Sequence, residues 1–162
     1  MALHFSKEEF SNRKNKVLKS MKEQNINALL IFRQESMYWL TGYDTFGYVF
    51  FQCLVLKDNG EIVLLTRVPD LRQAQNTSNI ENIKIWVDKD GSNPTDDLKK
   101  ILDELNLKGK NLGIEYEAYG LTGRNTLKLN KSLDNYCSIQ DKSELITKLR
   151  VVKSNEEIVY VK

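Results

Sequence analysis

The feature that most constrains the fold is a run of five apolar residues at positions 28–32, Ala-Leu-Leu-Ile-Phe, which follows an amphipathic segment. The run is too short for an ordinary helix, so it predicts a strand. Because strand side chains point alternately to the two faces of a sheet, a strand that is apolar at every position needs cover on both faces. Helices supply such cover, and the run therefore predicts an inner strand of an α/β fold.

A helix is predicted directly before this strand. Over residues 7–24, apolar side chains recur at helical spacing among charged ones. Ser6, followed three positions later by Glu9, has the pattern of a capping box, which marks the start of a helix. A helix followed by a buried strand is the usual opening of an α/β layer.

Strands and helices alternate along most of the remaining chain. Asp58-Asn59-Gly60 is a hairpin signal between predicted strands at 48–56 and 61–65, so the sheet is expected to contain an antiparallel pair. Further strands are predicted at 83–87, 112–115 and 136–139, and helices or helical turns at 36–40, 69–75, 95–105 and 119–129. The alternation predicts an α/β domain with a mixed sheet and helices on both faces.

The pattern changes after Asp141. Apolar residues then follow at helical spacing, at Leu145, Ile146, Leu149 and Val152, and a second helix is predicted at 156–162 behind a cap at Ser154. A helix of about seven residues is marginal on its own. We therefore expect the natural chain to continue, and residues 154–162 to be ordered mainly by contacts with the part that follows.

Composition excludes several classes of protein. The 162 residues suffice for one ordinary domain, or for one domain and a fragment of a second. Lys and Arg total 24 against 22 Asp and Glu, and this net charge of +2 argues against a nucleic-acid or anionic-membrane binder. The apolar runs are too short to cross a membrane. Cys53 and Cys137 form no metal-binding motif and His4 is the only histidine, so we expect free thiols, no metal site and a cytoplasmic location.

Aromatic residues are unusually dense between Met37 and Tyr48. One interpretation places Tyr38 and Trp39 in the core and treats the rest as loop decoration. The other makes residues 43–48 an exposed aromatic loop between flexible glycines, and such loops on rigid sheets are favoured contact surfaces. We choose this loop as the candidate substrate or interface site, with the residues Tyr43, Asp44, Phe46 and Tyr48.

Three motifs in this order resemble a known family. They are Tyr-Trp-Leu-Thr-Gly-Tyr at 38–43, Gly-Ile-Glu at 113–115 and Leu-Arg-Val-Val-Lys-Ser-Asn-Glu-Glu-Ile at 149–158. Together with the first helix and strand, they resemble the amino-terminal domain of the creatinase and Xaa-Pro peptidase family over nearly the whole chain. The resemblance implies an RNase H-like domain over residues 1–141, without nuclease activity. Residues 142–162 would be a linker and the start of the first helix of a missing pita-bread catalytic domain.

The resemblance implies an accessory role. The family's peptidases hold two metal ions in the carboxy-terminal domain, so the chain itself is expected to contain no catalytic residue and to hydrolyse neither Xaa-Pro dipeptides nor creatine-like substrates. The longer protein would be either a peptidase with two Mn, Co or Zn ions, or a metal-free hydrolase of a creatine- or ectoine-like compound. In a homodimer, the loop at 43–48 would reach the partner's active-site cleft. The alternative is a free-standing α/β domain that binds a small molecule or a partner, with no enzyme attached.

Overall fold

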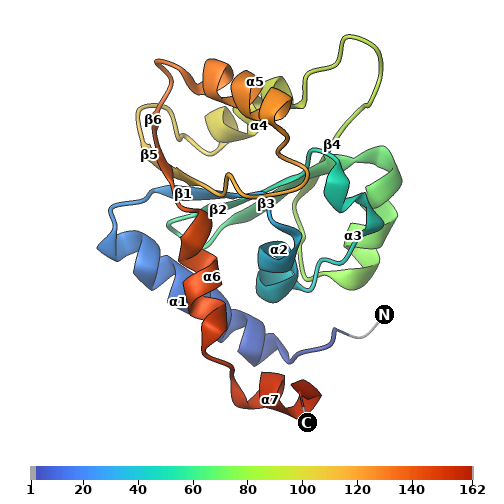
Figure 1. Ribbon diagram of the computed structural model, residues 1–162, viewed down its shortest axis with the longest axis vertical. Coiled ribbons are helices and arrows are strands. Elements are labelled where there is room, and N and C mark those ends of the chain that lie inside the picture. The colour runs from blue at the N-terminus through green and yellow to red at the C-terminus, as the bar shows by residue number, and fades with distance from the viewer. Residues whose placement is uncertain (1–2, 162) are drawn as a thin grey trace.

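The computed structural model describes residues 3–161 and contains one mixed sheet (Figure 1). Its strand order is β4-β3-β2-β1-β5-β6. The strands are β1 Ala28–Ile31, β2 Cys53–Lys57, β3 Ile62–Arg67, β4 Ile83–Trp86, β5 Asn111–Ile114 and β6 Ser138–Asp141. β1 runs antiparallel to β2 and parallel to β5, and β5 runs parallel to β6. The carboxyl ends of β1, β5 and β6 therefore meet at one edge of the sheet.

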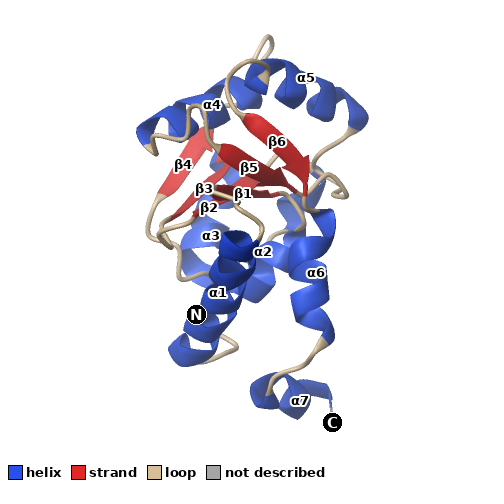
Figure 2. Ribbon diagram, turned by 90° about the vertical axis from the view of Figure 1, so that its left-hand side faces the viewer, coloured by secondary structure: helices blue, strands red, loops and turns tan. Residues whose placement is uncertain are grey.

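Helices cover both faces of this sheet, as predicted. They are α1 Lys7–Glu23, α2 Gln34–Thr41, α3 Leu71–Thr77, α4 Pro94–Glu104, α5 Gly123–Leu133, α6 Ser143–Val151 and α7 Asn155–Val161. Figure 2 shows α4 and α5 on one face, with α1, α2, α3 and α6 on the other. The predicted α/β class with a mixed sheet is confirmed.

The central strand β1 is apolar at every position because both of its faces are covered. Leu30 packs in a cluster with side chains of α4 and α5. Leu29 and Ile31 pack in a second cluster with side chains of α1, α2 and α6. All three side chains are completely buried, and each such burial contributes roughly 2 kcal/mol relative to exposure.

The long strand predicted at 48–56 is wrong in its first half. Residues Phe46–Val49 form a short 3-10 helix, and β2 begins only at Cys53. On one side, the partner strand β1 ends at Ile31, opposite Leu54, and the chain then turns into α2. The segment before Cys53 therefore has no ladder partner on that side, and β-propensity alone does not make a strand there.

The helix predicted at 119–129 starts later, at Gly123. The Thr122 hydroxyl accepts a hydrogen bond from the Asn125 backbone N–H and caps the helix. Gly120, in the loop before the helix, lies so close to the backbone at Phe50 that a Cβ on it would be 2.2 Å from the Phe50 carbonyl oxygen. The correction moves Tyr119 from a helix to a loop.

The carboxy-terminal segment packs on the domain more than the sequence pattern predicts. Helix α6 lies in the stretch assigned to a linker, yet Leu145 and Ile146 belong to the core. Helix α7 makes hydrogen bonds to the amino-terminal part of the chain through Glu156 and Tyr160. The structure therefore shows contacts of α7 within this chain, and whether contacts with a following part contribute more to its order stays a prediction. Lys162, the last residue of the predicted helix, lies outside the described residues.

Candidate functional site

The structure separates the four predicted site residues into two groups. Phe46 is 88% exposed, Tyr48 is 44% exposed, and Asp44 also lies on the surface. Tyr43 is completely buried, so its expected place in an exposed loop is wrong. The exposed aromatic surface begins after Tyr43, at Phe46.

Tyr43 instead anchors the loop from inside. Its hydroxyl donates a hydrogen bond to Gln52 Oε1 and lies 3.3 Å from Thr66 Oγ1. Burial raises the pKa of Tyr43 to about 12, so the phenol stays protonated and keeps its donor near neutral pH. Gln52 Nε2 in turn donates to the Gly47 carbonyl at 2.6 Å. A chain of buried hydrogen bonds thus links the core to the backbone beside Phe46.

Asp70 supports the same loop from a second direction. Its Oδ1 accepts a hydrogen bond from Thr45 Oγ1 at 2.9 Å, and its Oδ2 pairs with Arg67 Nε at 3.0 Å. A Cβ on Gly47 would lie 2.3 Å from Asp70 Oδ1, so only glycine allows this close packing. The loop is therefore held in one position by buried polar groups, which leaves the Phe46 ring as its exposed apolar feature.

The loop that follows β5 adds Tyr119 to the exposed aromatic surface of Phe46 and Tyr48. The Tyr48 and Tyr119 rings meet edge to face, with centroids 5.7 Å apart. The Arg67 guanidinium lies 3.4 Å from the centroid of the Phe50 ring. The site thus lies at the carboxyl edge of the parallel strands β1 and β5, the edge where α/β sheets commonly bind ligands.

A hollow of about 310 Å³ opens beside these rings. Its wall includes Tyr48 and Tyr119, with Glu35 at the start of α2. Arg33 also lines it, but its guanidinium is occupied by Glu117, with the Nη2 and Oε2 atoms 3.0 Å apart. The hollow therefore offers aromatic surface and hydrogen-bonding groups to a bound molecule.

The site contains no arrangement for metal catalysis. Among residues 3–161 there is no cluster of three or more His, Cys, Asp or Glu side chains that could hold an ion. The chain's own described residues therefore do not fit a dinuclear centre.

The described helices also include none that is long and apolar enough to span a bilayer.

Glu115 is a buried carboxylate that the sequence motif contains but does not explain. It follows β5 and accepts hydrogen bonds from the Phe32 and Arg33 backbone N–H groups and from Ser36 Oγ. Burial raises the pKa of Glu115 to about 7, although these hydrogen bonds oppose the shift. All of its described contacts are structural, and they fix the turn from β1 into α2. The only sequence signal for a role of Glu115 is that an acidic residue directly follows a buried strand.

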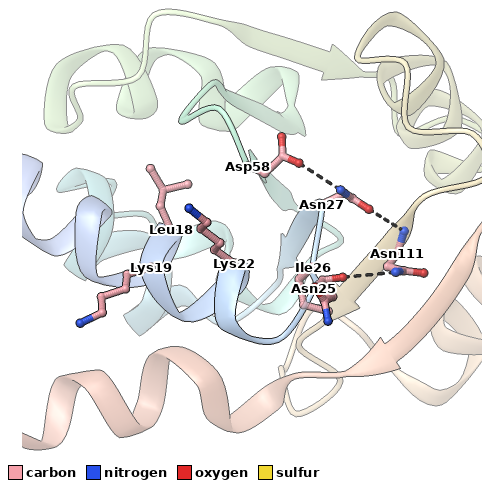
Figure 3. Close-up of a pocket in the computed structure, with 8 residues that line it drawn as sticks. All are labelled: Leu18, Lys19, Lys22, Asn25, Ile26, Asn27, Asp58 and Asn111. Atoms are coloured by element: carbon pink, nitrogen blue, oxygen red, sulfur yellow. Dashed lines mark hydrogen bonds between the residues drawn. The ribbon is translucent and has the colours of Figure 1, made fainter.

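A second hollow lies at the opposite edge of the sheet (Figure 3). Three of its polar side chains are hydrogen-bonded within the domain: Asn27 Nδ2 donates to Asp58, and Asn27 Oδ1 accepts from the Asn111 backbone N–H. Asn111 Nδ2 also donates to the Asn25 carbonyl. These bonds join the starts of β1 and β5, so this hollow has a structural explanation.

Replacing Tyr43 with Phe tests the anchor. The change removes one buried donor and leaves Gln52 Oε1 with one partner fewer, so we expect the free energy of unfolding to fall by about 1–2 kcal/mol. Tyr119→Phe is the control, because that ring is 75% exposed and its change should be nearly neutral. Urea unfolding of both variants measures the difference. Equal stabilities would show that the Tyr43 hydroxyl does not anchor the loop.

Comparisons with known proteins agree with this architecture. A family model described as the creatinase/prolidase N-terminal domain matches residues 13–152. An uncharacterized hydrolase/peptidase of Sinorhizobium fredii is 27% identical over 99% of the chain, and an ectoine hydrolase of Halomonas elongata is 28% identical over 100% of it. The chain spans 42% of the length of each of these curated relatives.

Solved structures share the fold. A recombinant prolidase from Thermococcus sibiricus superposes with a TM-score of 0.76 at 21% identity. The match covers 93% of this chain and 39% of the prolidase chain. At this identity, the likeness supports the fold alone.

Proposed function

This chain belongs to the creatinase/prolidase N-terminal domain family, and from that premise we propose that it serves a hydrolase as a non-catalytic domain. In this role it contributes to a homodimer and places residues 44–48 in the active-site cleft of the partner subunit. Catalysis belongs to a carboxy-terminal domain outside this chain. The curated relatives, of which the chain spans 42%, support a longer protein of this kind.

One observation carries the proposal: the Phe46 ring is 88% exposed on a loop that buried hydrogen bonds hold in place. Exposing a large ring in water is unfavourable, and a loop fixed around it loses little entropy on binding. The combination is typical of a contact residue that is covered in an assembly.

The names of the relatives support a reaction class. We propose hydrolysis of a C–N bond, in an Xaa-Pro peptide or in an ectoine- or creatine-like compound. If the substrate is a peptide, two divalent ions (Mn, Co or Zn) would be held by the other domain. The two free cysteines, Cys53 and Cys137, support a reducing, cytoplasmic location.

The hollow beside Tyr48 and Tyr119 favours a second candidate, a free-standing domain that binds a small molecule or a partner. The two functions differ in what the isolated chain does. A free-standing binding domain should bind its ligand without any other subunit. An accessory domain should affect substrate only within the longer dimeric enzyme.

The test of the accessory role is Phe46→Ala in the longer protein that carries this domain. Removing an anchor ring costs about 1–3 kcal/mol of binding, so kcat/KM should fall by roughly tenfold or more while Tm stays the same. Leu127→Ala is the matched control, since Leu127 is 74% exposed on α5, outside the loop.

Two outcomes contradict the proposal. An unchanged kcat/KM in a folded dimer would show that Phe46 does not serve the partner's cleft. A large fall in Tm would show that the ring stabilises the domain and is not held ready for a partner.

A further inference from the structure

Arg13 is a cation inside the protein. It lies on α1 and is 1% exposed, which is unusual for a charged residue. Three aromatic rings surround its guanidinium: the distances from the guanidinium carbon to the ring centroids are 4.0 Å for Phe5, 5.3 Å for Trp39 and 5.5 Å for Phe10. A buried charge of this kind is stable only when it is paired and hydrogen-bonded.

Arg13 has one partner on its own helix and two from distant parts of the chain. Its Nε pairs with Glu9 Oε1 at 2.8 Å, one turn earlier on α1, and its Nη1 donates to the Trp39 carbonyl at 3.0 Å. Its Nη2 lies 3.2 Å from Glu157 Oε1, an ion pair rather than an aligned hydrogen bond. Glu157 belongs to α7, so Arg13 joins the first helix to the last.

Glu157 both starts α7 and attaches it. Its Oε2 accepts a hydrogen bond from the Ser154 backbone N–H at 2.8 Å, and Ser154 Oγ accepts one from the Glu157 N–H, which together make a capping box. Its Oε1 accepts a hydrogen bond from Trp39 Nε1 at 2.8 Å. The Glu157 carboxylate therefore caps the amino-terminal end of α7 and also contacts α2.

The amino-terminal segment contacts the same helix. Ser6 donates to Glu156 from its backbone N–H at 3.0 Å and from its hydroxyl at 2.6 Å. The Tyr160 hydroxyl donates to the His4 carbonyl at 2.7 Å, and the Tyr160 ring meets the Phe5 ring edge to face. Residues 4–6 are thus placed between α1 and α7. Figures 1 and 2 show α1, α6 and α7 on the same side of the sheet.

Little else holds α7. The helix buries none of its described residues, and Val152 before it is 76% exposed. A helix of about seven residues is not stable alone in water. Among residues 3–161, the contacts just described are therefore the ones that hold α7 in place.

We propose that Arg13 is a latch through which the amino-terminal segment and α7 become ordered together, so that residues 4–6 control the direction of the chain after Val152. The latch consists of Phe5, Arg13, Trp39 and Glu157. Its working does not depend on the proposed function, because both ends of the latch lie within this chain.

Hydrogen exchange on the full chain tests the latch. In Arg13→Met, the amides of residues 155–161 should lose protection by on the order of tenfold or more, while β1 and β5 keep theirs. Phe5→Ala should have the same effect on residues 155–161, although residue 5 is far from them in sequence. Lys16→Met is the matched control, because Lys16 is an exposed cation on the same helix.

A second variant separates the latch from the helix cap. Glu157→Gln keeps a side chain that can cap the helix but removes the charge that faces Arg13. Loss of protection in α7 and a shifted Trp39 indole N–H resonance would support the latch. If Arg13→Met proves too unstable to fold, Glu157→Gln and Phe5→Ala still decide the question. Unchanged protection of α7 in Phe5→Ala would overturn the coupling, as would unchanged protection in Glu157→Gln.

Discussion

Replacing Glu115 with alanine is expected to lower the free energy of unfolding by about 3–5 kcal/mol, enough to unfold a marginal domain. The carboxylate is completely buried and accepts hydrogen bonds from Phe32 N at 3.2 Å, Arg33 N at 3.0 Å and Ser36 Oγ at 2.7 Å. Alanine leaves these donors without their acceptor and creates a cavity between β1 and β5. Urea unfolding followed by circular dichroism measures the loss.

Glu115→Gln is the matched control, because its amide oxygen can still accept the two backbone hydrogen bonds. We expect most of the stability to remain in this variant. A loss as large as that of Glu115→Ala would mean that the negative charge, rather than the hydrogen bonds, is what the site requires.

The pH dependence of stability should distinguish glutamate from glutamine at position 115. Because burial raises the pKa of Glu115 from 4.5 to about 7, the folded state holds this proton more tightly than the unfolded chain. The stabilisation from this group is therefore complete below about pH 4.5 and is lost as the pH rises through about 7. The stability of the wild type minus that of Glu115→Gln should fall between about pH 4.5 and about pH 7 and be constant above that range. A constant difference would contradict a raised pKa.

Gly120→Ala is expected to destabilise the domain by about 3 kcal/mol and to displace the aromatic loop. A Cβ at this position would lie 2.2 Å from the Phe50 carbonyl oxygen and 3.2 Å from that of Tyr48. Both obstacles are backbone atoms, so no side-chain rotation relieves the contact and the two loops must separate. The edge-to-face pair of Tyr48 and Tyr119 should then be lost, which ring resonances in NMR spectra would report.

Gly123→Ala is the control for this change. Gly123 is the first residue of α5, and a Cβ there meets nothing within 4 Å. Alanine at this position should be neutral or should stabilise the domain by about 0.5–1 kcal/mol, because it restricts the unfolded chain. Equal stability of the two variants would show that the close approach at Gly120 is not a constraint.

Local sequence patterns predicted the structure correctly where the interacting groups lie close together in the chain. The helix start predicted at Ser6 is confirmed, since the Glu9 N–H donates to Ser6 Oγ at 3.0 Å. The second bond of the predicted capping box is replaced, because the Ser6 N–H donates to Glu156 and not to Glu9. The turn at 58–60 is also confirmed, with Gly60 at φ +89°. In both cases the interacting groups lie within three residues of each other, so the sequence alone brings them together.

The candidate site could be predicted only in part. The dense aromatic segment indicated the right region, and Phe46 and Tyr48 are on the surface. It could not indicate that Tyr43 is buried, because its hydroxyl is surrounded by Gln52, just before β2, and by Thr66 of β3. Asp70, which holds the loop against Gly47, had no sequence signal at all.

The sequence by itself determined the α/β class, because an apolar strand such as 28–32 requires helices on both faces whatever the detailed topology. Only the tertiary structure decided which ring of the aromatic segment is exposed and that α7 packs against α1. These outcomes depend on contacts between residues far apart in the chain, such as Arg13 with Glu157. The energy of such a contact depends on distance and burial in the folded state, and no local spacing of residue types encodes either quantity.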